Sequence, residues 1–336
     1  MKKEIKQTLE PWFQGHNLKW LEDRTIFLTV HGSRAYGTST PSSDIDIKGL
    51  VIPPKEYFHG FSKSFEQAEA TEPYDMVIFG LHKFMKLAAD CNPNIIEILF
   101  TDPEDWIFET EIFNKLWAHR ELFLSRKARF TFSGYAHQQL KRIKGHKRWL
   151  LEPPTHKPTR EEHGLPVMRK LSASELGATQ KLIEGNVKLD DSVMHLFNLE
   201  QKYQSALREW QQYENWKRNR NKKRAELEAK FGYDCKHALH LVRLMRMCRE
   251  ILTDGTVLVR RPDAQELLAI RDGAWAYDEL IEWAEKQDGE MEALFKTSPL
   301  PQKPDVHKID KLCQELVEEA IERADLSSNF LPDLKL

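Results

Sequence analysis

The sequence has only four cysteines in 336 residues, and no two of them form a CxxC pair. Cys91, Cys235, Cys248 and Cys313 lie far apart in the chain. This spacing argues against a zinc site built on paired cysteines and against a disulfide framework. We therefore expect a protein of a reducing compartment, the cytoplasm.

Long apolar runs are also missing, since no segment approaches the roughly 18 apolar residues of a membrane span. The N-terminal segment MKKEIKQTLEPW contains lysines but no apolar core or small-residue cleavage site behind them, so nothing there predicts secretion. A composition of 40% hydrophobic and 30% charged residues is typical of a soluble globular protein. The length allows two domains.

The formal net charge of −2 hides an uneven distribution of charge. Residues 120–170 contain 13 Lys and Arg against 4 Glu, and residues 217–230 contain 7 against 2. From residue 262 to the end there are 8 basic and 18 acidic residues. Basic segments of this size are typical of nucleic-acid-binding proteins, although solvated helix faces also carry Lys and Arg. The composition favours a nucleic-acid partner for the basic middle, residues 120–230.

The stretch HGSRAYGTSTPSSDIDIKGLV, residues 31–51, combines a Gly-Ser pair with closely spaced carboxylates. Its second half alternates charged and small or apolar residues as a strand does, so Asp44, Asp46 and Lys48 share one face. Two aspartates at neighbouring positions on one face repel each other unless a cation lies between them. We predict that this cation is Mg²⁺, which takes one or two protein carboxylates and completes its shell with water and substrate phosphates.

The residues before these carboxylates have the chemistry of a phosphate site. Gly32 lets the backbone approach a phosphate closely, and the Ser33 hydroxyl and nearby N–H groups can donate to it. Arg34 adds a positive charge suited to phosphate oxygens. An ordinary turn before a strand with a solvated face is the alternative explanation. We favour a nucleotide-binding site.

Gly32-Ser33, ten further residues and Asp44-Ile45-Asp46-Ile47 resemble the signature of the DNA polymerase beta-like nucleotidyltransferase superfamily. Members carry a third acidic residue on a later strand, and Asp75 in YDMVIF matches that description. Three nearby glutamates compete for the role: Glu66, Glu69 and Glu72. We favour Asp75 because only this residue is followed by an apolar, strand-like run. The blocks HGSRAYG, SDIDIKG, CNPNIIEILF and YDCKHALHLVRL also resemble the branch of the superfamily that accompanies RNA ligases in bacterial and phage RNA-repair gene sets.

This resemblance implies transfer of NMP from an NTP, such as ATP, to a hydroxyl acceptor with release of pyrophosphate. Two Mg²⁺ ions, with Mn²⁺ as an alternative, would be bound by Asp44, Asp46 and Asp75. Asp75 would also take the proton of the attacking hydroxyl. The expected acceptor is RNA, either a tRNA or an RNA end, and an RNA ligase is an expected functional partner.

We predict an α+β fold, with a small mixed sheet in a catalytic domain over residues 1–105 and a mainly helical region over residues 106–336. Within the first domain, helices are expected at residues 5–13 and 81–91. Asn92 followed by Pro93 predicts the start of another helix.

In the helical region, residues 108–124 have apolar residues at helical spacing, and the pattern from Leu196 to Ala229 predicts one long helix. The basic, proline-punctuated segment at residues 141–166 has two explanations. It is either an ordinary turn between helices or a loop that contacts a phosphate backbone, with Trp149 stacking on a base. The acidic tail is expected to form two helices joined by the loop at residues 298–304.

The block at residues 233–252 predicts a helix on which Lys236, His240 and Arg243 share one polar face. Two cations with a histidine of adjustable charge suit contact with a triphosphate or an RNA phosphate. A surface helix with an incidental histidine is the alternative. With the family resemblance we favour nucleotide binding.

Two other classes of function stay open. The same chemistry could modify a hydroxyl of a protein or small molecule, although the basic middle of the chain weighs against it. A non-catalytic RNA-binding module with this fold is the other class, and the intact carboxylates weigh against it. The base of the NTP and the end of the acceptor do not follow from the metal site.

Overall fold

The structure is a computed structural model that describes residues 2–167, 173–184, 191–220 and 222–326. The chain forms two compact units. We call residues 1–141 together with 235–336 the core unit, and residues 142–234 the helical unit. None of the described helices has the length and apolarity required to span a bilayer.

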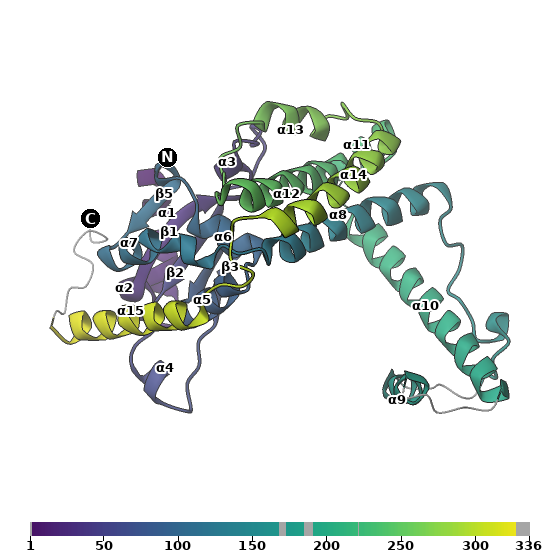
Figure 1. Cartoon of the computed structure of the whole chain (residues 1–336), viewed down its shortest axis with the longest axis horizontal. Coiled ribbons are helices and arrows are strands. Elements are labelled where there is room, and N and C mark those ends of the chain that lie inside the picture. The colour runs from purple at the N-terminus through teal and green to yellow at the C-terminus, as the bar shows by residue number, and fades with distance from the viewer. Residues whose placement is uncertain (1, 168–172, 185–190, 221, 327–336) are drawn as a thin grey trace. The chain divides into compact units, whose positions relative to one another are not determined.

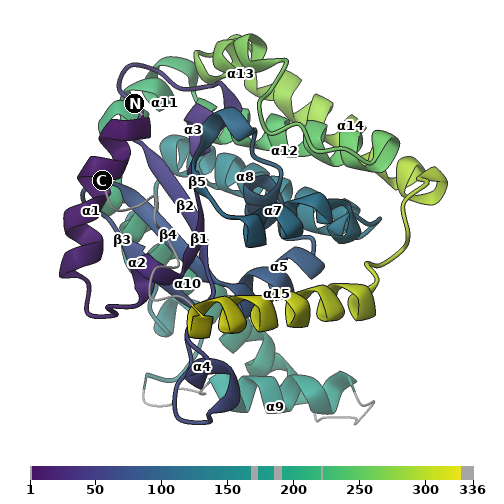
Figure 2. The same cartoon turned by 90° about the vertical axis from the view of Figure 1, so that its left-hand side faces the viewer.

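The core unit contains a five-stranded sheet with the order β3-β4-β2-β1-β5. Figure 1 shows the sheet in purple and blue, and Figure 2 labels its strands. Its strands are β1 (Thr25–His31), β2 (Asp46–Val51), β3 (Gln67–Ala70), β4 (Asp75–Gly80) and β5 (Trp106–Glu109). β2 and β4 are parallel, and every other neighbouring pair is antiparallel. The small mixed sheet that the sequence predicts is therefore confirmed.

Helices cover the sheet and extend the core unit. Those that precede the helical unit are α1 (Lys2–Gly15), α2 (Leu21–Arg24), α3 (Gly32–Tyr36), α4 (Glu56–His59), α5 (Leu81–Ala89), α6 (Pro93–Leu99), α7 (Glu111–Ala118) and the 3-10 helices η1 (Pro103–Asp105) and η2 (Arg120–Phe123). Those that follow it are α12 (Cys235–Asp254), α13 (Ala264–Arg271), α14 (Tyr277–Thr297) and α15 (Val306–Leu326). Figure 2 shows α12, α13 and α14 grouped together, while α15 packs against α5 and α7.

The centre of the sheet is buried, since every residue of β1 is buried, whereas β3 and β4 alternate buried with half-buried or exposed residues. Ile5, Leu9 and Phe13 form the buried stripe of α1, at the helical spacing that the sequence predicts. They share one apolar cluster with strand residues such as Val30 and Ile47. In another part of the core Phe27 stacks on Phe113 of α7, with ring centroids 3.6 Å apart.

The helical unit consists of helices and their connections in the part of the chain that the structure describes. They are the end of α8 (Ala128–Leu151), which begins in the core unit, then η3 (Glu161–His163), α9 (Ala173–Glu184), α10 (Asp191–Asn219) and α11 (Lys222–Phe231). Arg160 and Glu200 form a buried ion pair in this unit, with Nη1 2.8 Å from Oε1.

Several sequence predictions are confirmed. Helices occur at residues 5–13 and 81–89, and the Asn92 side chain caps α6 by accepting from the backbone N–H of Asn94 at 3.1 Å. The acidic tail forms α14 and α15, joined by a loop that includes residues 298–304.

Two predictions are wrong. Residues 106–109 form a strand, not the start of a helical region, because they pair with β1: Phe108 lies opposite Leu28. The side-chain pattern gave no sign of this partner. The long helix predicted to Ala229 ends at Asn219, and Arg220 turns to pair with Glu228 of the next helix. The boundary predicted at residue 105 stays a prediction, although the sheet extends to Glu109.

Candidate active site

Asp46 and Asp75 are the first residues of two neighbouring parallel strands, and they lie opposite each other in the register. Adjacent strands are about 4.8 Å apart, so the two carboxylates project from the same edge of the sheet. Asp44 precedes β2 by two residues. Asp44 and Asp75 are exposed and Asp46 is half-buried. The three predicted metal ligands therefore lie at or just before the first residues of β2 and β4.

The alternation predicted for residues 44–48 is present from Asp46, where β2 begins, whereas Asp44 lies outside the strand. Ile47 is fully buried, whereas Lys48 faces the carboxylates with its Nζ 3.6 Å from Oδ1 of Asp75. Burial raises the pKa of Asp46, and the negative charges of Asp75 and Asp44 raise it further, while Lys48 and Lys236 oppose the rise. The carboxylates thus concentrate negative charge on hard oxygen atoms, which is the donor set that Mg²⁺ prefers.

Gly32 packs directly against Asp46. Its φ is +65°, in the left-handed region, and a Cβ built on it would lie 1.9 Å from Oδ2 of Asp46. No other residue fits at this position without moving the carboxylate. The Gly-Ser motif and the aspartate motif, which are separated by a loop in the sequence, therefore form one surface.

The other residues of the Gly-Ser motif shape the loop that leads to β2. The guanidinium of Arg34 donates to the carbonyl oxygens of Ser43 at 3.0 Å and Asp44 at 3.4 Å. The carbonyl of Ser33 accepts from the N–H of Thr38 at 2.8 Å, which closes the turn after α3. Arg34 thus holds the backbone of a predicted metal ligand, and its role toward phosphate stays a prediction.

The helix predicted from the YDCKHALHLVRL block is α12, and its first turn reaches the site. The positive charge of Lys236 opposes the rise that burial causes in the pKa of Asp46, so Lys236 acts electrostatically on the carboxylates. His240 is half-buried. Arg243 lies seven positions after Lys236 on the same helix, but its side chain is only 5% exposed and forms a buried ion pair with Glu97. Its role toward a nucleotide stays a prediction.

Sequence reasoning missed two residues behind the site, Glu97 of α6 and Tyr36 of α3. The Tyr36 hydroxyl donates to Oε2 of Glu97 at 2.5 Å, and Nη1 of Arg243 donates to Oε1 at 2.5 Å. His31 lies beside them, with Nε2 3.8 Å from the same carboxylate. The signal was present, because Glu97 is a single acid inside the apolar run Ile95–Leu99.

In the helical unit Trp149 is not available for stacking on a base. It is 8% exposed, and its ring packs against Trp216 and Tyr213 of α10, with centroids 5.5 and 5.8 Å away. Arg220 lies over the ring of Trp216, at 4.7 Å from the centroid. The structure therefore supports a role for Trp149 in the packing of α8 against α10.

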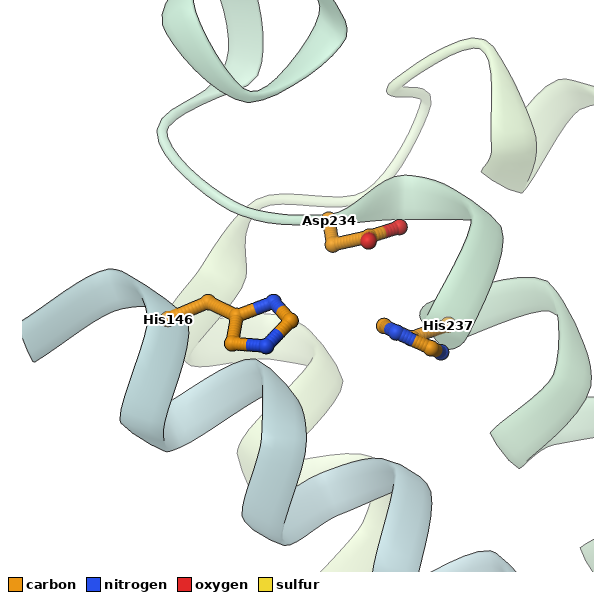
Figure 3. Close-up of side chains that lie close together, drawn as sticks. All are labelled: His146, Asp234 and His237. Carbon is orange, nitrogen blue, oxygen red and sulfur yellow. The ribbon is translucent and has the colours of Figure 1, made fainter. Parts of the chain in front are cut away.

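Figure 3 shows another group of side chains that bind metals in proteins, namely His146 of α8, Asp234 and His237 of α12. His146 belongs to the helical unit and His237 to the core unit, so we assign no cation to this group. Within its own unit His146 lies 3.6 Å from the carboxylate of Glu228.

A small mixed sheet with acidic residues at the start of two neighbouring strands is the arrangement that the resemblance to polymerase beta-like nucleotidyltransferases predicts. Residues 1–154 match the RlaP family, described as the RNA repair pathway DNA polymerase beta family. The resemblance found in the motifs is thereby confirmed, both for the superfamily and for its association with RNA repair. Enzymes of this class typically use divalent metal ions.

A phage protein is also similar to part of the chain. Over 90 residues the chain is 33% identical to an Enterobacteria phage T4 protein described as "Uncharacterized 38.9 kDa protein in nrdC-mobD intergenic region". The similarity covers 24% of this chain and 27% of the phage protein, so the chain spans about a quarter of that relative.

Proposed function

We propose that this protein is a metal-dependent nucleotidyltransferase that transfers NMP from an NTP to a hydroxyl of RNA and releases pyrophosphate. The observation that carries the proposal is the meeting of Gly32, Asp46 and Asp75 at one edge of the sheet. The match of residues 1–154 to an RNA-repair family supports both the chemistry and the acceptor.

In this proposal Asp44, Asp46 and Asp75 bind two Mg²⁺ ions, with Mn²⁺ as a substitute. When bound, these ions neutralise the phosphate charge that builds up in the transition state. The donor set fits, since it consists of three carboxylates at one strand edge, where the pKa of Asp46 is raised partly by the other two. Lys48 and Lys236 add positive charge beside the carboxylates.

The chain's own residues position the reactants. Gly32 and Ser33 face the triphosphate, and Arg34 fixes the loop that carries Asp44. The acceptor's hydroxyl oxygen attacks the α-phosphorus, and the bond from that phosphorus to the oxygen bridging the α- and β-phosphates breaks. Asp75 takes the hydroxyl proton, and pyrophosphate leaves. Catalysis of this kind rests on positioning and charge neutralisation.

The acceptor proposal rests on charge as well as on family. Residues 142–234, the helical unit, include the basic segment 217–230, whose Lys and Arg outnumber its Glu 7 to 2. Exposed cations such as Lys217 and Arg218 suit a phosphate backbone. An RNA ligase that seals the extended end would be the functional partner, and the cytoplasm the place of action.

The experiment incubates purified protein with Mg²⁺, each α-labelled NTP in turn, and a mixture of intact and nicked tRNA. Wild type is compared with Asp44→Ala and Asp75→Asn, and Glu69→Gln serves as the control because Glu69 is an exposed acid on β3. We expect label on RNA with wild type and the control, and none with the aspartate variants.

Each other outcome has a definite meaning. Label on a protein or small molecule, with none on RNA, would replace the RNA acceptor by a different hydroxyl. Nucleotide binding without transfer to any acceptor would indicate a binding module that keeps the fold. Equal labelling by the aspartate variants would contradict the assignment of the site.

A further inference from the structure

Glu97 occupies a position between two elements of the site that are far apart in the sequence. Its Oε2 accepts from the Tyr36 hydroxyl of α3, and its Oε1 accepts from the Arg243 guanidinium of α12, each at 2.5 Å. The guanidinium also lies over the Tyr36 ring, 3.8 Å from its centroid. One carboxylate therefore joins the Gly32–Tyr36 helix to the helix that carries Lys236.

The cluster is buried and its charges balance. The Glu97 side chain is 1% exposed and that of Arg243 is 6% exposed. Burial raises the pKa of Tyr36 well above its usual range and lowers that of His31 to about 4, so both are neutral near pH 7. A single ion pair with a bonded hydroxyl remains, and a buried pair of this kind holds its geometry tightly because neither partner can find water.

A second contact holds α3 in place. The backbone N–H of Arg261 donates to the carbonyl of Tyr36 at 3.1 Å. The Arg261 side chain is 1% exposed and pairs with Glu250 at 2.6 Å and Asp263 at 2.8 Å. The segment around residues 260–263 thus anchors α3 to the end of α12 and the start of α13.

We propose that Glu97 is a positioning residue that braces α3 against α12 and so fixes the nucleotide-binding half of the site relative to Asp46. Glu97 acts on Gly32 and Lys236 through Tyr36 and Arg243, which lie on the same two helices. The proposal deepens the proposed function and rests on it for the identity of the ligand, an NTP phosphate chain. The brace itself is a property of the folded chain and is tested without the ligand.

Two backbone amides report directly on α3. The N–H of Gly37 donates to the carbonyl of Arg34 at 3.2 Å, and that of Thr38 donates to Ser33 at 2.8 Å. Native-state hydrogen exchange of these amides is compared between wild type and Tyr36→Phe, which removes the hydroxyl but keeps the ring. We expect at least about tenfold faster exchange, as for the loss of a hydrogen bond to a charged group.

The matched control is Tyr135→Phe. The Tyr135 hydroxyl accepts from the Asn92 side chain at 3.1 Å, so its removal breaks a hydrogen bond at the start of α6 and leaves those between Tyr36, Glu97 and Arg243 in place. This control should leave the two reporter amides unchanged. Unchanged exchange in Tyr36→Phe, or equal acceleration across the whole sheet, would overturn the proposal, since the second result indicates only general destabilisation.

Nucleotide affinity gives a second, separable readout. Titration with Mg²⁺ and each NTP should show about tenfold weaker binding for Tyr36→Phe than for wild type. Glu97→Gln, whose amide can still bridge Tyr36 and Arg243, should bind the NTP more tightly than Glu97→Ala. If the alanine variant does not fold, the affinity of Tyr36→Phe alone tests the proposal. Wild-type affinity in Tyr36→Phe would contradict the proposal. Failure of wild type to bind any NTP would contradict the proposed function, while hydrogen exchange would still decide the brace.

Discussion

The α-carbon of Gly32 lies so close to the Asp46 carboxylate that a methyl group on it would sit 1.9 Å from Oδ2. This contact explains why a glycine and an aspartate fourteen positions apart act as one motif. The glycine leaves room for the carboxylate, and the left-handed turn at φ +65° directs the chain into α3. Three tests concern this contact and its neighbours, and a fourth concerns the basic end of α10.

Gly32→Ala should abolish nucleotide transfer while the protein stays folded. The added methyl displaces Asp46, and a shift of about 1 Å at a reacting centre costs on the order of 100-fold in rate. Gly37→Ala is the matched control, because Gly37 also has positive φ but its Cβ would meet only Ala264 at 3.5 Å. Both variants should lose about 1 kcal/mol of stability to the left-handed backbone. Equal turnover in the two, measured with labelled NTP, would show that Gly32 does not shape the site.

Asp46→Asn and Asp75→Asn should each weaken binding of Mn²⁺, used as a probe for Mg²⁺, because each removes a charged oxygen ligand. The loss of several kcal/mol of transition-state stabilisation corresponds to a rate at least about 100-fold lower. Glu66→Gln should change neither quantity, since the Glu66 carboxylate forms its ion pair with Lys83, with Oε2 2.7 Å from Nζ. Paramagnetic titration and labelling assays measure the two effects. Tight Mn²⁺ binding in both aspartate variants would show that the metal binds at other residues.

Stability should fall as the pH drops from above 6.5 toward 4. Burial lowers the pKa of His31 from 6.5 to about 4. Between these values the unfolded chain binds a proton that the folded chain does not, so acid favours unfolding. The full effect is about 3 kcal/mol, present above pH 6.5 and lost near pH 4.

Urea unfolding of wild type and His31→Gln at several pH values measures this contribution. The difference in unfolding free energy between the two proteins should change with pH in that window. His119→Gln, which alters an exposed histidine, should keep the wild-type dependence. A wild-type curve parallel to that of His31→Gln would show that His31 does not titrate as its burial requires.

Replacing Lys217 and Arg218 by Ala should weaken RNA binding and make it less dependent on salt. Both side chains are exposed on α10, and each phosphate contact that is lost lowers the slope of log affinity against log salt by about 1. Lys308 and Lys311, also exposed but in the acidic tail, give the matched double variant. Filter binding across a salt series distinguishes the two. An identical slope in both variants would exclude the basic end of α10 from the RNA interface.

The local pattern of the sequence was sufficient for the elements around the motif. Alternation of Asp46, Ile47 and Lys48 predicted a strand with one charged face, and Asn92 with Pro93 predicted a capped helix, because both rules depend on neighbouring residues alone. The same rules placed Lys236 on a helix. They gave the wrong result at residues 106–109, where pairing with β1 overrides a pattern that reads equally well as helix.

The sequence by itself thus determined which chemical groups the proposed site contains, since glycine, serine and aspartate at fixed spacing are properties of one short segment. Only the tertiary structure decided which partners this segment meets. Parallel pairing of β2 with β4 brought Asp75 to Asp46. Arg243, predicted on the polar face of a helix, is buried against Glu97 because a buried carboxylate requires a buried cation. The source of that cation, 146 residues away, is fixed only when α6 and α12 pack together.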